Sequence, residues 1–246
     1  RDFQQVDVFT ATPYLGNPVA VVLQGDGLDE ATMQRFAQWT HLSETTFMLT
    51  PTDPLADYRL RIFTPGGELQ FAGHPTLGSC HAWLAAGGKP KSGENVVQQC
   101  GVGLVSIQRD GDALAFAAPP LQRSAVDAGL IDAVAAALGL APTQIVAAQM
   151  LDNGTRWLGL LLDNTERVAQ LRPDFARLKA AGHKLGVAAV RAGPPTPEQD
   201  ADLLVRGFAP HMGIDEDPVT GSLNAALAQW LIAEGHMPAS YVAAQG

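Results

Sequence analysis

The sequence predicts an α+β protein of two similar lobes, because one motif occurs twice. Residues 61–65 read Arg-Ile-Phe-Thr-Pro, and residues 206–210 read Arg-Gly-Phe-Ala-Pro. Each motif leads through a loop to a glycine, Gly73 or Gly221, and then to a run of small and apolar residues that ends in Trp-Leu. A strand that leads into an apolar helix, found twice, indicates two lobes that each have a central helix.

The first lobe is predicted to open with two strands and a helix. Residues 5–9 alternate apolar and polar side chains, and a Gly-Asn-Pro turn leads into a β-branched strand at 19–23. Asp29 is a suitable N-cap for the helix that follows. The buried face of this helix is indicated by residues at helical spacing: Met33, Phe36, Ala37 and Thr40.

Both halves continue in the same order. In the first half we expect strands at 45–49 and 58–63 and a central helix from Thr76 to Ala86. In the second half the expected elements are helices at 128–138, 175–181 and 223–233, and strands at 157–162, 186–191 and 241–244. A surface turn is expected at 193–197, which is rich in proline. The predicted lobes are residues 1–118 and 119–246.

Composition excludes several functional classes. The 246 residues carry a formal net charge of −9 and contain no cluster of Lys and Arg, which argues against nucleic-acid binding. No apolar stretch is long enough to span a membrane, and the first residues lack a signal pattern, so we expect a soluble cytoplasmic protein. Cys80 and Cys100 are expected to be buried free thiols. The histidines form no metal-binding pair, so no metal site is predicted.

Glu44 is the first candidate for chemistry. It lies between the end of a helix and an apolar strand, where partial loss of solvent favours a carboxyl group that gives and takes protons. The alternative is a solvated or capping residue, which is the commoner role of a glutamate at such a junction. The corresponding junction of the second half, residues 183–186, holds no acid. A single acid/base indicates isomerisation, whereas a simple two-base racemase needs two.

His74 is the second candidate. It follows Gly73 and precedes Pro75, a residue that suits the first turn of a helix, so His74 should lie at or next to the N-cap. There it would donate a hydrogen bond to a substrate or act as a second acid/base, and its alternative role is that of a capping or loop histidine.

The second lobe offers an equivalent set of binding residues. Asp217 would hold an amino or hydroxyl group, and the N–H groups of Gly221 and Ser222 would bind a carboxylate. The alternative is that residues 217–222 form only a turn and a helix cap. Arg206, like Arg61 in the first lobe, is expected to make structural hydrogen bonds rather than to bind substrate.

These motifs together resemble the PhzF-like isomerase family of phenazine biosynthesis. The resemblance runs from the first residues to about Gly246. It is carried by Val-Asp-Val-Phe-Thr at 6–10, Gly-Asn-Pro at 16–18, Leu-Ser-Glu-Thr at 42–45, Arg-Ile-Phe-Thr-Pro at 61–65, Phe-Ala-Gly-His-Pro-Thr at 71–76 and Glu-Asp-Pro-Val-Thr-Gly-Ser at 216–222.

The resemblance implies a diaminopimelate-epimerase-like fold, in which a curved mixed sheet wraps a central helix in each of two pseudo-symmetric lobes. It also implies an active site between the lobes, a homodimer, and isomerisation of trans-2,3-dihydro-3-hydroxyanthranilate without metal or organic cofactor. Glu44 matches the family's proton-shuttling glutamate. Gly73 and His74 match its substrate contacts, as do three residues of the second lobe: Asp217, Gly221 and Ser222.

Two differences and two alternatives accompany the resemblance. Related racemases carry a cysteine near each helix N-terminus, whereas this chain has none there. The family's chains usually continue past Gly246, so closing strands of the second lobe are expected to be missing. The chain is therefore expected to be an isomerase that moves a proton on a small carboxylate-bearing substrate. The alternatives are an isomerase or epimerase of another small amino or hydroxy acid, and a non-catalytic small-ligand binder.

Overall fold

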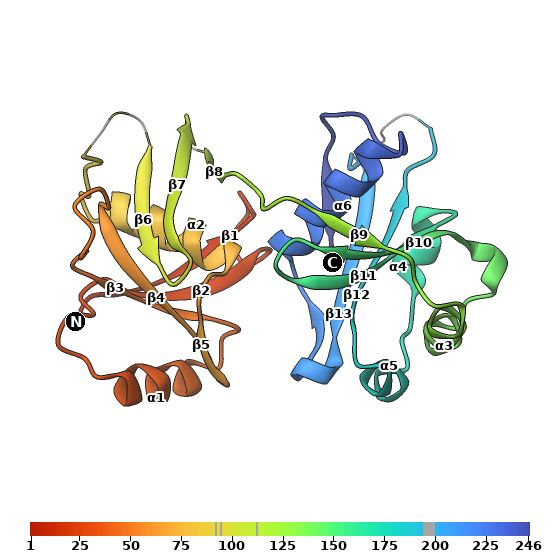
Figure 1. Ribbon diagram of the computed structural model, residues 1–246, viewed down its shortest axis with the longest axis horizontal. Coiled ribbons are helices and arrows are strands. Elements are labelled where there is room, and N and C mark those ends of the chain that lie inside the picture. Colours follow the sequence, from red (N-terminus) through yellow and green to blue (C-terminus); the bar gives the residue numbers. More distant parts are fainter. Residues whose placement is uncertain (92, 94, 112, 194–199) are drawn as a thin grey trace. The chain divides into compact units, whose positions relative to one another are not determined.

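The chain folds into two units, residues 1–117 and residues 118–246 (Figure 1). The structure is a computed structural model. The structure describes residues 1–91, 93, 95–111, 113–193 and 200–246. The turn expected at 193–197 therefore lies, beyond Gly193, outside the described residues.

The first unit is built on one mixed sheet. Its strands are β1 (Phe3–Val8), β2 (Asn17–Val22), β3 (Thr45–Leu49), β4 (Tyr58–Thr64), β5 (Gly67–Leu69), β6 (Val96–Cys100), β7 (Gly103–Asp110) and β8 (Ala113–Phe116). They are ordered β1-β2-β3-β4-β6-β7-β8, and β5 also pairs with β4. The pairs β2·β3 and β4·β6 are parallel and the others are antiparallel.

Two helices cover this sheet. The apolar helix α2 (Gly73–Ala85) packs against β1, β2 and β3 (Figure 1), and its Cys80 and Ala82 are fully buried with Val19 and Val21. Helix α1 (Glu30–Thr40) packs on β3 and β4.

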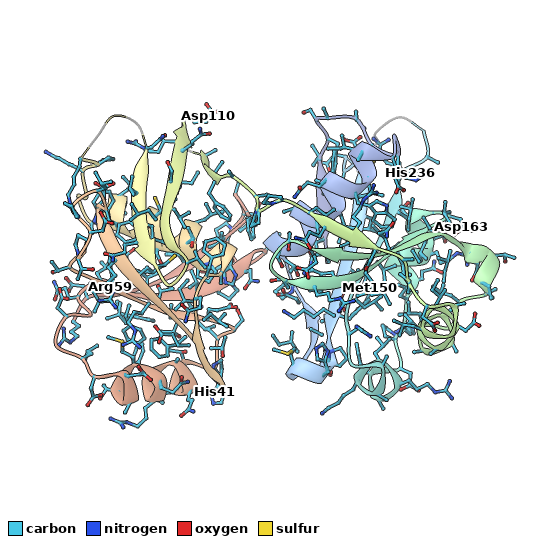
Figure 2. The ribbon with its side chains drawn as sticks, viewed as in Figure 1. His41, Arg59, Asp110, Met150, Asp163 and His236 are labelled. Atoms are coloured by element: carbon cyan, nitrogen blue, oxygen red, sulfur yellow. The ribbon has the colours of Figure 1, made fainter. Side chains whose placement is uncertain are left out.

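Helix α1 is capped at both ends. Asp29 caps it by accepting a hydrogen bond from the Thr32 N–H at 2.7 Å, as predicted. His41, labelled in Figure 2, ends it with a left-handed backbone at φ 55°. Of the predicted stripe, Met33 and Ala37 are fully buried.

The second unit repeats this plan. Its strands are β9 (Gln122–Ser124), β10 (Ile145–Asp152), β11 (Arg156–Leu162), β12 (Lys184–Val190), β13 (Leu203–Ala209), β14 (Ile214–Asp217) and β15 (Ala243–Gln245). Helix α6 (Gly221–Ala233) packs on one face of this sheet, and its Leu223 and Trp230 lie in the core between helix and sheet. The other face carries α3 (Ala128–Leu138), α4 (Thr165–Gln170) and α5 (Phe175–Ala181). Short 3₁₀ turns lie at η1 (Pro142–Gln144) and η2 (Pro210–Met212).

The pairing of strands confirms the internal repeat. β11·β12 is parallel and β12·β13 is antiparallel, as are β2·β3 and β3·β4. β13 then pairs with β14 antiparallel and with β15 parallel, as β4 pairs with β5 and β6. Helices α2 and α6 each have 13 residues and each begin at the glycine of the repeated motif. The predicted α+β class is thereby confirmed.

A glutamine anchors each of these helices to its own sheet. In the first unit the buried Gln98 of β6 donates to the Thr76 hydroxyl of α2 at 3.0 Å. In the second unit Gln245 of β15 accepts from Asn224 of α6 at 2.7 Å and from the Thr220 N–H at 2.9 Å. The first turn of each helix is thus fixed by contacts within its own unit.

Several sequence predictions need correction. The central helices begin earlier than expected, at Gly73 and Gly221, because loop residues form their first turns. β1 ends at Val8, since Phe9 has a positive φ of 66°. Strands β6 to β8 were not predicted. Among the described residues, no helix is both long enough and apolar enough to cross a membrane.

Candidate active site

The loop between α1 and β3 positions Glu44. Its backbone carbonyl accepts a hydrogen bond from the Ala20 N–H of β2 at 3.4 Å. The next residue, Thr45, is fully buried and its hydroxyl lies 2.8 Å from that of Thr40, which ties β3 to the end of α1. The Glu44 side chain is thus held at the start of a buried strand and is 17% exposed.

His74 is the second residue of α2, so it lies one step inside the helix rather than at the N-cap, which is Ala72. Its side chain is 9% exposed. Gly73 opens the helix in a confined place, because a Cβ atom there would lie 3.3 Å from the ring of Phe116. The positive end of the helix dipole at the start of α2 favours negative charge beside His74.

The structure brings these two sequence candidates together. Nε2 of His74 lies 3.5 Å from Oε2 of Glu44. This distance is long for a hydrogen bond and suits an ion pair when the imidazole is protonated. A carboxylate and an imidazole in contact, both largely withdrawn from water, form a pair that can exchange protons with a ligand.

In the second unit, Asp217 and the start of α6 are close together. Asp217 is the last residue of β14, and its Oδ2 accepts a hydrogen bond from the Thr220 hydroxyl at 2.7 Å. Its backbone carbonyl accepts from Gln245 Nε2 at 2.9 Å. Thr220 occupies the N-cap position, but its side chain makes no capping hydrogen bond to α6.

Gly221 and Ser222 are the first two residues of α6, as Gly73 and His74 are of α2. The Ser222 hydroxyl accepts a hydrogen bond from Nε1 of the buried Trp157 at 3.1 Å. Its carbonyl accepts from Asn153 Nδ2 at 2.8 Å. Neither Trp157 nor Asn153 could be predicted from the sequence as a partner of Ser222, since only the pairing of β10 with β11 brings them to this helix.

The cysteines lie away from both helix starts. Cys80 is in the middle of α2 and fully buried, and burial raises the pKa of its thiol from the usual 9.0 to about 11. At neutral pH it is therefore an unreactive thiol. Cys100 ends β6 and is only partly buried, so the expectation of two buried thiols was wrong for this residue.

The two repeated arginines make the hydrogen bonds within their own units that were expected of them. Arg61 binds Glu68 twice at 2.6 Å and Glu30 at 2.8 Å. Arg206 binds both oxygens of Glu216 at 2.7 Å. Across the described residues, no group of three or more His, Cys, Asp or Glu side chains is placed to hold a metal ion.

Comparison with known proteins identifies the family that this chain matches. Residues 6–245 match the PhzC-PhzF family, described as phenazine biosynthesis-like protein. The chain is 36% identical over 98% of its length to antisense-enhancing sequence 1 of Schizosaccharomyces pombe, of which it covers 83%. It is 32% identical over 94% of its length to trans-2,3-dihydro-3-hydroxyanthranilate isomerase of Pseudomonas fluorescens, of which it covers 80%.

A solved structure confirms the expected fold. The PhzF-family phenazine biosynthesis protein of Bacillus anthracis has a TM-score of 0.82 to this chain at 23% identity, over 98% of this chain and 80% of its own. The chain belongs to the PhzC-PhzF family, and the names of its relatives indicate an isomerase.

Proposed function

We propose that the protein is a cofactor-independent isomerase that moves a proton on a small carboxylate-bearing substrate, with Glu44 as its general acid/base. The observation that carries the proposal is the Glu44–His74 pair, in which two groups suited to proton transfer lie 3.5 Å apart and largely buried. The proposed substrate class follows the named activity of the Pseudomonas fluorescens relative, which acts on trans-2,3-dihydro-3-hydroxyanthranilate.

In the proposed reaction, Glu44 removes a proton from carbon, and Glu44 or His74 returns a proton at a conjugated position. The double bond moves, and the proton count of the substrate is unchanged. Gly73 contributes its N–H group to substrate binding. In the second unit, Asp217 holds an amino or hydroxyl group, and the N–H groups of Gly221 and Ser222 bind the carboxylate.

The asymmetry between the two units supports isomerisation over two-base racemisation. The repeat duplicates the strands and the central helix but carries one glutamate at the position of Glu44. Cys80 does not supply a second base, because its thiol is fully buried and its pKa is raised. A single acid/base that removes and returns protons is sufficient to shift a double bond. Inversion of a stereocentre by two bases would need a second base.

The test measures carbon-bound deuterium. Wild-type protein and the variants Glu44→Gln and Glu30→Gln are incubated with trans-2,3-dihydro-3-hydroxyanthranilate in deuterated water, and the product is followed by ultraviolet absorbance and mass spectrometry. We expect kcat to fall about 10²–10⁴-fold in Glu44→Gln, because the loss of a placed acid/base costs this much. Glu30 is an exposed carboxylate of α1 and serves as the matched control.

Each outcome bears on a separate part of the proposal. Normal turnover by Glu44→Gln would remove Glu44 from the mechanism. Failure of a folded wild-type protein to turn over or label this compound would reject it as substrate, and binding of the compound without labelling would favour a ligand-binding protein. For His74→Ala we expect weaker binding together with slower turnover, and an unchanged kinetic profile would make His74 structural.

A further inference from the structure

The strand register identifies which residue of the second unit stands at the position of Glu44. In the first unit Thr45 pairs with Phe63, and in the second unit Leu185 pairs with Phe208. Phe63 and Phe208 are equivalent in the repeated Arg-x-Phe motif, so Thr45 corresponds to Leu185. The residue before each is then Glu44 in the first unit and Lys184 in the second. The repeat therefore replaces a carboxylate with an ammonium group.

The same correspondence holds for the neighbours of these two side chains. His74 and Ser222 are each the second residue of a central helix. Glu44 contacts His74 directly. Lys184 is linked to Ser222 through Trp157, since its Nζ lies over the Trp157 ring, 5.5 Å from the centroid, and Trp157 Nε1 donates to the Ser222 hydroxyl at 3.1 Å. The cation–π contact directs the ammonium group along the face of a buried ring.

Two histidines lie near Lys184. His183 precedes it in the chain, and His211 in η2 interacts electrostatically with both residues. The pKa of His211 is lowered, first by burial and then by the positive charges of Lys184 and His183.

We propose that Lys184 is the cation that binds the substrate carboxylate, as the counterpart of Glu44 in the second half of the repeat. The inference rests on the proposed function. A substrate carboxylate that leaves water on binding is stabilised by a nearby cation. An ammonium group held on an aromatic face supplies that positive charge, and it can donate charge-assisted hydrogen bonds to the carboxylate oxygens.

The experiment compares two probes that differ in charge and little in shape. Anthranilate carries a carboxylate, and anthranilamide carries a neutral amide in its place. Their dissociation constants are measured by calorimetry for wild type, Lys184→Met, Lys184→Gln, Lys184→Arg and Lys179→Met. Lys179 is an exposed lysine of α5 in the same unit and is the matched control.

We expect wild type to bind anthranilate at least about 10-fold more tightly than anthranilamide, the size of one charge-assisted contact. Lys184→Met and Lys184→Gln should lose this preference without losing affinity for anthranilamide, and Lys184→Arg should keep most of it. Lys179→Met should behave as wild type. A merely structural lysine would instead weaken both probes equally.

The results separate this inference from the proposed function. The inference is overturned if wild type shows no preference for anthranilate, if the preference survives in both neutral variants, or if both probes weaken together. Should deuterium transfer to trans-2,3-dihydro-3-hydroxyanthranilate be absent while the preference depends on Lys184, the proposed reaction fails and the carboxylate-binding role stands. If deuterium transfer occurs and Lys184 has no effect on binding, the proposed reaction stands and the carboxylate-binding role of Lys184 fails.

Discussion

Replacement of Arg206 by methionine should destabilise the second unit more than the equivalent change at Arg61 destabilises the first. Arg206 donates two hydrogen bonds to Glu216 at 2.7 Å and two more, at 3.2 and 2.8 Å, to the carbonyls of Val168 and Leu171 at the end of α4. One side chain therefore joins β13, β14 and a helix terminus. Methionine keeps an apolar stem beside Phe208 but removes all four bonds.

The magnitude follows from burial. Loss of one partner of a fully buried ion pair costs about 3–5 kcal/mol. The side chains of Arg206 and Glu216 are 14% and 30% exposed, which lowers this cost, and the two carbonyls add a smaller amount. We expect a net loss of about 2–3 kcal/mol. For Arg61 we expect about 1–2 kcal/mol, because it donates the three bonds described above instead of four and one of its two carboxylate partners, Glu30, is 71% exposed.

Urea denaturation with hydrogen exchange resolved by peptide provides the assay. The exchange data assign the loss to a unit, and peptides of β14 report whether the strand that carries Asp217 has loosened. Equal urea midpoints for Arg206→Met and wild type, or a larger loss in Arg61→Met than in Arg206→Met, would refute the reasoning from burial and bond number.

Two further predictions concern α2. Gly78→Ala should lower the melting temperature by about 3–8 °C, although alanine favours helices, because its Cβ would lie 2.5 Å from Val19 Cγ1 and 2.9 Å from Val8 Cγ2. A raised melting temperature in calorimetry would contradict this close packing. Native protein at pH 8 should be alkylated by iodoacetamide at Cys100 and not at Cys80. Burial raises the pKa of Cys80 from 9.0 to about 11, so the thiol ionises at a lower pH in the unfolded chain than in the folded protein. The contribution of Cys80 to the free energy of unfolding should therefore fall as the pH rises from about 9 to 11. Rapid alkylation of Cys80 in the native protein, detected by mass spectrometry, would contradict its burial in the core.

The fold was largely predictable where burial leaves a regular pattern in the sequence. β3 was predicted at its observed bounds, and so was α3, because the residues of each are apolar enough to mark one element. β7 was missed because Ile107 is its only buried residue among those described, so no alternation marks it. β14 reads Ile-Asp-Glu-Asp and becomes a strand only through pairing with β13.

The candidate site was predictable as a set of residue types and not as an arrangement. Glu44 and His74 were each identified from the segment around them, but their contact depends on how α2 packs against the sheet. Lys184 lies in the junction at residues 183–186, where the sequence shows only that an acid is lacking. Its equivalence to Glu44 becomes visible when strand register is counted from Phe208, and register is a tertiary property.

The glutamine anchors have a consequence for how the two halves of the repeat respond to substitution. Gln98 fixes the start of α2 and Gln245 that of α6, each through hydrogen bonds within its own unit. A substitution at the start of one central helix should therefore leave these anchoring bonds of the other helix in place. The scaffold can thus carry different chemistry in its two halves, as the opposite charges of Glu44 and Lys184 at equivalent positions illustrate.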